Sequence, residues 1–153
     1  MLETIARFFS ELHFQYTEQF LTALIPMSLT VICHGFGMGL VRSYFKRFGA
    51  SVSMRSVRRT ILLVVIVAIM LTTHYFEIII WAEFYYLTDM IQNIKTAMYF
   101  SVQSYTTLGA SNIMLPGRWQ GLEGFEALTA MLMFGWSTAI LVAVVHKVHS
   151  IDN

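Results

Sequence analysis

The residues best suited to chemistry form a short polar run, Thr106-Thr107-Leu108-Gly109, between two strongly apolar stretches. A short helix that enters a membrane and stops at these threonines points its partly negative C-terminal end at the bilayer interior. Gly109 permits an unusual backbone angle, so that carbonyl groups of successive residues can face one axis. Rings of backbone carbonyls can replace the hydration shell of an ion. The run therefore predicts a cation site that several copies of the chain build around a shared axis.

The order of segments around this run resembles the pore module of the potassium-channel superfamily. A helix, a re-entrant helix, the Thr-Thr-Leu-Gly run, Pro116 and a last helix follow one another over roughly residues 60–148. The last segment, from Gly121 to Ala139, is similar to small bacterial proteins of the two-transmembrane ion-channel family. This resemblance implies a homotetramer around a central pore and a passive flow of cations through it.

The resemblance also implies which residues meet the ion. Backbone oxygens of the filter, with the Thr107 hydroxyl, are its expected ligands, and the predicted ion-binding set is Thr106, Thr107, Leu108, Gly109, Ala110 and Ser111. The outer mouth is expected to carry Asn112, Glu123 and Glu126. Repeated around a fourfold axis, Glu123 and Glu126 would form acidic rings that concentrate cations. An equally good interpretation is that the helix dipole favours these two carboxylates at the start of a helix. On the inner helix, Gly135 is the expected hinge and Val144 the expected gate, which closes by dewetting.

Four positions depart from the potassium signature Thr-Val-Gly-Tyr-Gly-Asp, and the mildest change is Leu108 in place of the Val. Ala110 replaces the Tyr, Ser111 replaces the second Gly, and Asn112 replaces the acid. A shorter or wider filter would leave ions partly hydrated and would separate sodium from potassium poorly. Potassium conduction is the first prediction, and a weakly selective cation channel is the alternative. A non-conducting structural or regulatory membrane subunit is the alternative from another class.

Composition sets the wider frame. The chain has 153 residues, of which 56% are hydrophobic and 12% are charged, against about 25% charged in soluble domains. These values argue against a soluble enzyme and against a disordered chain, and the net charge of +1 gives no basic field for nucleic acid. No catalytic set or phosphate-binding loop is evident. We therefore expect no enzyme and no cofactor, only a permeant monovalent cation, most simply K⁺.

The elements that must position the filter follow from hydropathy. A spanning helix needs about 20 mostly apolar residues, and three segments meet that need, so we predict an all-α membrane protein with three transmembrane helices, a re-entrant pore helix and an extended filter. The predicted order is an amphipathic interfacial helix over 1–19, a first span over 20–41, a basic linker over 42–59 and a pore module over 60–148. Within the module we expect an outer helix over 60–87, a pore helix over 92–106, a filter over 107–112 and an inner helix over 123–147.

Orientation follows from the basic residues. The 42–59 linker carries six Lys or Arg and no acid, and cytoplasmic loops are enriched in such residues. We therefore expect the N-terminus outside and the C-terminus in the cytoplasm, most simply of a bacterial inner membrane. Few residues follow the last predicted span. The gating stimulus is therefore expected from the membrane, voltage, pH, lipid or an unidentified regulatory partner.

Two other features of the spans invite interpretation. His34 and His74 lie within separate predicted spans, where histidines can ligate haem or a metal. The alternative, which the sequence favours, is a buried His satisfied by a neighbour, such as His74 by Glu77 one turn on. Gly35 and Gly39 form a small-xxx-small pair that predicts the close approach of another helix.

Overall fold

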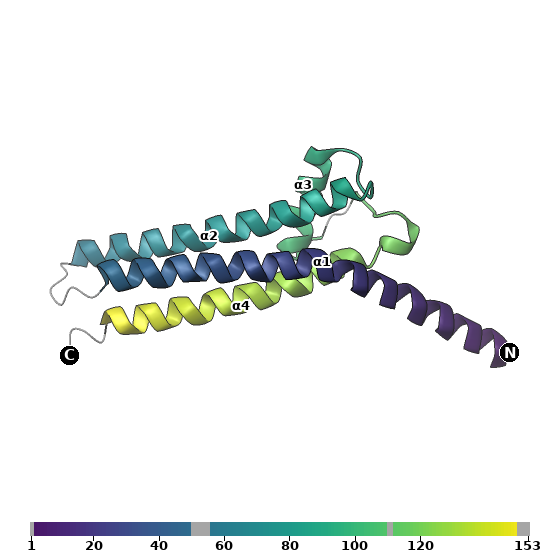
Figure 1. Ribbon diagram of the computed structural model, residues 1–153, viewed down its shortest axis with the longest axis horizontal. Helices are drawn as coiled ribbons and strands as arrows, with labels where there is room; N and C mark the ends of the chain where they lie inside the picture. The colour runs from purple at the N-terminus through teal and green to yellow at the C-terminus, as the bar shows by residue number, and fades with distance from the viewer. Residues whose placement is uncertain (1, 50–55, 110–111, 150–153) are drawn as a thin grey trace. The chain divides into compact units, whose positions relative to one another are not determined.

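The computed structural model describes residues 2–49, 56–109 and 112–149, and all regular structure in these ranges is helical. The elements are α1 (Leu2–Phe48), α2 (Ser56–Leu87), α3 (Ile94–Tyr105), a short 3-10 turn (Gly117–Trp119) and α4 (Leu122–His149) (Figure 1). Three segments are long and apolar enough to cross a membrane, namely Phe14–Phe48, Val57–Leu87 and Gly117–Val148. The prediction of an all-helical integral membrane protein with three spanning helices is confirmed at this level.

The helices build two compact units, each with a core of its own. Among the described residues, unit 1 comprises 2–29, 78–109 and 112–130, and unit 2 comprises 30–49, 56–77 and 131–149. The polar run after α3 belongs to unit 1.

Unit 1 is organised around large aromatic side chains. Trp81 and Tyr85 of α2, Phe100 and Tyr105 of α3, and Leu122 of α4 are all fully buried in one cluster. The rings of Tyr85 and Phe100 meet edge to face with centroids 5.1 Å apart, a favourable geometry for aromatic pairs. These contacts hold α3 against the end of α2 and the start of α4 (Figure 1).

Helix α3 is too short to cross a membrane. Its 12 residues span about 18 Å at a rise of 1.5 Å per residue, against about 30 Å of hydrocarbon. Asn93 begins the helix, because its side chain accepts hydrogen bonds from the backbone N–H groups of Lys95 and Thr96. The local sequence therefore fixes where α3 starts, and the aromatic core fixes which face it buries.

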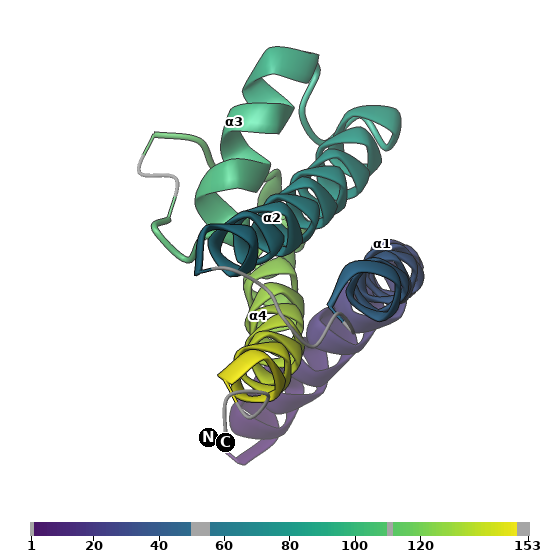
Figure 2. The same cartoon turned by 90° about the vertical axis from the view of Figure 1, so that its left-hand side faces the viewer.

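Unit 2 packs parts of α1, α2 and α4 around an aliphatic core, and Figure 2 shows these three helices nearly end on. Met38, Val41, Leu62, Ile66 and Val144 are among its buried residues. Large apolar side chains also lie exposed along the outer faces of the helices, as the hydrocarbon of a membrane requires of any surface that meets it.

The close approach of α1 and α2 in unit 2 occurs at Gly37. A Cβ atom added there would lie 2.1 Å from Thr73 Oγ1, whereas no described atom lies within 4 Å of a Cβ added at Gly35 or Gly39. Within the described part of the chain, the close contact is therefore at Gly37, half a turn from Gly35 and Gly39, and no helix approaches these two glycines. Gly37, which lies between Gly35 and Gly39 in the sequence, is the glycine at which α1 and α2 touch.

Two predicted boundaries also differ from the structure. The predicted interfacial helix over 1–19 and the predicted first span over 20–41 belong to one helix, because α1 runs without a break through residues 19 and 20. At this point Gln19 is buried and donates a hydrogen bond to the carbonyl of Arg118. Both ends of the expected linker over 42–59 are helical, because α1 continues to Phe48 and α2 begins at Ser56. Basic residues favour such an extension, since Lys46 and Arg47 in the last turn of α1 complement the helix dipole.

Candidate functional site

The polar run begins inside the C-terminal cap of α3. The N–H of Thr107 bonds to the carbonyl of Ser104 at 3.0 Å, and the N–H of Leu108 reaches back to the carbonyl of Gln103 at 3.0 Å. These two bonds are the pair that defines a Schellman motif. The residue between the helix and the reversal must then adopt a left-handed backbone, and that residue is Thr107.

The left-handed position is unusual for threonine. Thr107 has φ +61°, where glycine is the common residue and a β-branched side chain is strained. The left-handed conformation costs roughly 1–2 kcal/mol for a residue with a Cβ. Gly109 follows at φ +80°, where its lack of a side chain avoids the same penalty. Strain of this kind clusters at ligand-binding positions.

The run projects from the core of unit 1. Thr106, Thr107, Leu108 and Gly109 are exposed, with the side chain of Leu108 three-quarters exposed. The Thr106 hydroxyl donates to the carbonyl of Val102 at 2.6 Å, which leaves its oxygen able to accept or to ligate.

A small open hollow brings the run together with the start of α4. Thr107 and Gly109 line it from one side and Glu123 from the other, and the remaining lining residues are Ser104, Gly124 and Ala127. The exposed carboxylate of Glu123 therefore shares a surface with two of the predicted ion-binding residues. This is the arrangement expected of a carboxylate that attracts cations to oxygen ligands.

Glu126 differs from its predicted place at the outer mouth. Its side chain is fully buried, where Oε2 accepts a hydrogen bond from Tyr85 Oη at 2.8 Å and Oε1 lies 2.5 Å from Ser101 Oγ. Positions 123 and 126 are neighbours on one side of α4, so the burial of Glu126 follows from its contacts with Tyr85 and Ser101 and not from helix periodicity. Glu126 instead ties α4 to α2 and α3 behind the run.

The two residues predicted to act on the inner helix, Gly135 and Val144, also differ in their exposure. Gly135 lies on an exposed face of α4, which continues through it as regular helix. Val144 is 7% exposed and belongs to the core of unit 2, so in the single chain it does not lie on an exposed face, where the expected gate would be. Val142, which is 61% exposed, is the valine that α4 turns outward.

The remaining predicted residues fall at the far end of the run. Ala110 and Ser111 lie outside the described residues. Asn112 is exposed in a turn, and the chain then returns to the core at Leu115, which is buried.

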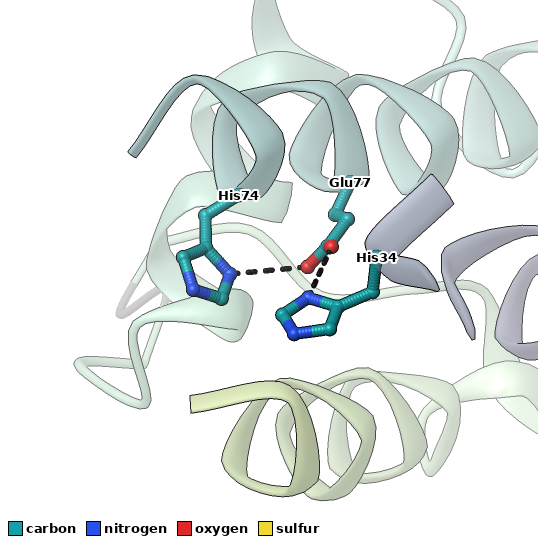
Figure 3. A group of neighbouring side chains, drawn as sticks. All are labelled: His34, His74 and Glu77. Carbon is teal, nitrogen blue, oxygen red and sulfur yellow. Dashed lines mark hydrogen bonds and ion pairs between the residues drawn. The ribbon is translucent and has the colours of Figure 1, made fainter. Parts of the chain in front are cut away.

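A second polar cluster lies inside unit 2 (Figure 3). His34 Nδ1 of α1 lies 2.8 Å from Glu77 Oε1, and His74 Nδ1 of α2 lies 3.1 Å from Glu77 Oε2. Ser137 Oγ of α4 lies 3.1 Å from His74 Nε2 and 3.4 Å from His34 Nε2. The predicted His74–Glu77 contact is confirmed. One turn of α2 holds that pair, and facing positions of α1 and α4 complete the cluster.

Some of these partners were invisible in the sequence. The spacing of His74 and Glu77 indicates one contact, but nothing in a hydropathy pattern shows that His34, forty-three residues away, faces the same carboxylate. Ser101 and Tyr85 likewise show no motif that would pair them with Glu126. A polar residue on the buried side of an apolar helix is the only sequence signal that such contacts leave.

Searches of protein-family models, curated proteins and solved structures found no match to this chain.

Proposed function

We propose that the chain is one subunit of a homotetrameric cation channel whose filter begins at Thr106 and Thr107 and continues to Asn112. Potassium is the simplest permeant ion. The observation that carries the proposal is the end of α3, where a helix too short to span stops at exposed threonines and two left-handed residues, Thr107 and Gly109.

The physical argument has three steps. The C-terminal end of α3 carries partial negative charge, and its last carbonyls accept hydrogen bonds from the N–H groups of Thr106, Thr107 and Leu108. The residues after it leave regular structure while they remain exposed in the single chain. Irregular backbone at membrane depth is tolerated only where protein buries it or water lines it. Copies of the chain around an axis meet that requirement, because each covers the run of its neighbour.

Glu123 supports a positive permeant ion. Its exposed carboxylate lines the same hollow as Thr107 and Gly109, and repetition around an axis would multiply its charge. The basic residues at the C-terminal end of α1 and the N-terminal end of α2 favour a cytoplasmic position for these two ends. In this orientation the filter opens outward, in what is most simply a bacterial inner membrane.

The decisive test is a reversal potential. The purified chain would be reconstituted in planar bilayers with potassium on one side and sodium on the other. We expect cation current that reverses near the potassium equilibrium potential. A reversal near zero with clear current would replace potassium selectivity with a weakly selective pore, since Ala110 and Ser111 depart from the potassium signature. Silence from folded protein across voltage and pH would favour a non-conducting membrane subunit.

A pair of glycine variants makes the test specific to the run. Gly109→Ala adds a Cβ at φ +80° and should reduce the current, because an L-residue resists that backbone angle. Gly39→Ala is the matched control, since an added Cβ there meets no described atom within 4 Å and the backbone is helical. Equal currents from the two variants would remove Gly109 from the conduction path.

A further inference from the structure

The apolar interior of unit 2 holds three ionisable side chains in contact. His34, His74 and Glu77 are buried, with His34 and Glu77 fully so, and all three lie in segments long and apolar enough to span a membrane. Ionisable groups in such segments are costly and mark functional sites.

The spacing of the ligand atoms suits one shared ion. One atom from each of the three residues can be chosen so that all lie within 4.8 Å of one another. A tetrahedral zinc site has bonds of about 2.0–2.2 Å to histidine nitrogen and carboxylate oxygen, which places ligand atoms about 3.3 Å apart. The two contacts between histidine nitrogens and the carboxylate measure 2.8 and 3.1 Å. Small side-chain adjustments therefore convert the cluster into a coordination shell.

Ser137 gives both rings a hydrogen-bond partner on the side away from the carboxylate. Its hydroxyl can donate to Met38 Sδ, which lies 3.9 Å from Oγ. The Ser137 oxygen can then accept hydrogen bonds from the Nε2–H groups of both His34 and His74. Without an ion, an Nδ1–H of each ring can donate to a carboxylate oxygen of Glu77 (Figure 3). When an ion binds, each ring can carry its proton on Nε2 instead and offer the Nδ1 lone pair to the ion.

The rings are also held in place. His34 packs on Trp136 with centroids 5.0 Å apart, and His74 packs on Phe134 with centroids 4.8 Å apart. Metal-binding histidines commonly donate the other ring N–H to a neighbouring oxygen, which fixes the tautomer and the orientation. Ser137 provides that oxygen for both rings, so α4 orients the ligands that α1 and α2 supply.

We propose that His34, His74 and Glu77 bind one divalent transition-metal ion, most simply Zn²⁺, through two imidazole nitrogens and a carboxylate, with Ser137 as the residue that orients both rings. Two nitrogens and one oxygen suit zinc and its neighbours in the first transition row better than Mg²⁺ or Ca²⁺, which prefer oxygen alone. The ion would join α1 to α2 within unit 2.

Cobalt provides the direct test. The full chain in detergent would be treated with a chelator, returned to metal-free buffer near neutral pH and titrated with Co²⁺. We expect visible absorption that saturates at one Co²⁺ per chain and disappears when Zn²⁺ is added. Added Zn²⁺ should also raise the Tm, because an ion that binds only the folded state stabilises it.

Four variants locate the site. His34→Gln and Glu77→Gln should lose the cobalt absorption, and Ser137→Ala should weaken binding by about 10- to 100-fold, as removal of an orienting partner commonly does. His146→Gln is the matched control, because His146 is an exposed histidine of α4 in the same unit, and it should bind like the unmodified chain. Circular dichroism identifies any variant that fails to fold.

Two results would overturn the proposal. The first is that the unmodified chain, which carries no substitution that could prevent folding, binds neither Co²⁺ nor Zn²⁺. Equal binding by His34→Gln and the unmodified chain would place the metal elsewhere. The measurement involves no ion flux, so its failure leaves the channel proposal in place.

Discussion

Thr107 occupies a backbone conformation that suits glycine better than threonine. Replacing it with glycine should relieve the strain at φ +61° and raise the free energy of unfolding by roughly 1 kcal/mol. The same variant removes a predicted ligand hydroxyl, so cation current should fall. Thermal unfolding and bilayer recordings measure the two effects. A stabilised protein with reduced current would show that the chain keeps a strained threonine for its function.

Thr106→Gly serves as the control for that variant. Thr106 has an ordinary φ of −81°, and its hydroxyl donates to the carbonyl of Val102, so its loss should destabilise the end of α3. If both glycine variants destabilise the protein equally, Thr107 does not adopt the left-handed conformation.

Glu126 gives a second prediction for a single residue. The one hydroxyl hydrogen of Ser101 faces two acceptors, the carbonyl of Ile78 at 2.9 Å and Glu126 Oε1 at 2.5 Å. If the side chain at position 126 donates a hydrogen bond to Ser101 Oγ, the hydroxyl hydrogen of Ser101 is left for the carbonyl of Ile78 alone. Glu126→Gln should therefore keep near-normal stability, since its amide donates to Ser101 and its oxygen accepts from Tyr85.

Glu126→Ala is the contrasting variant. It leaves the buried hydroxyl of Tyr85 without its carboxyl acceptor, and an unsatisfied buried polar group costs about 1–3 kcal/mol, in addition to the cavity. Thermal unfolding should separate alanine clearly from glutamine. Equal losses from the two variants would mean that the charge of Glu126, rather than its hydrogen bonds, supports unit 1.

Helix contacts provide the prediction at the scale of the elements. Gly37→Ala places a methyl group 2.1 Å from Thr73 Oγ1, and Thr73 is stiff because its hydroxyl also bonds to the carbonyl of Ile69. Helices α1 and α2 must then separate, at a cost of about 1–3 kcal/mol. Gly35→Ala should be neutral, since no described atom lies near its added Cβ. Thr73→Ala in the Gly37→Ala background should recover part of the loss, and no recovery would exclude this contact as the cause.

The elements were more predictable than their contacts. Hydropathy alone identifies three spans, because a membrane imposes length and composition on any helix that crosses it. The run at Thr106–Gly109 was also recognisable, since glycine after threonines marks a chain reversal. The facing of side chains was not recognisable: Val144 turned inward, Glu126 was buried and Gly37 was the packing glycine. These outcomes depend on how α4 and α1 rotate about their axes, and helices that are apolar on every side carry no periodicity to fix that rotation.

The polar clusters extend this point. In unit 1 the buried carboxyl of Glu126 joins three helices, and in unit 2 Glu77 joins two and Ser137 brings in the third. A membrane offers helices little hydrophobic drive to associate, so hydrogen bonds and close packing select the register. Scattered polar residues in apolar spans therefore mark the positions where helices meet, although the sequence does not show which residue each one contacts.

At the scale of the whole molecule, one chain supplies one run of the predicted filter residues, so the proposed conduction requires assembly. The proposed tetramer should have a protein mass of about 70 kDa, four times the 17.5 kDa of one chain, by native mass spectrometry in detergent. If carbonyl oxygens from four chains meet at one axis, their dipoles repel one another unless a cation lies between them. The tetramer should therefore resist heat better in potassium chloride than in the chloride of a large organic cation, because only potassium fits between the oxygens and binds the assembled state. Identical dissociation temperatures in the two salts would mean that the oxygens do not converge, and a monomer in both would leave the run at Thr106–Gly109 without the neighbours that a pore requires.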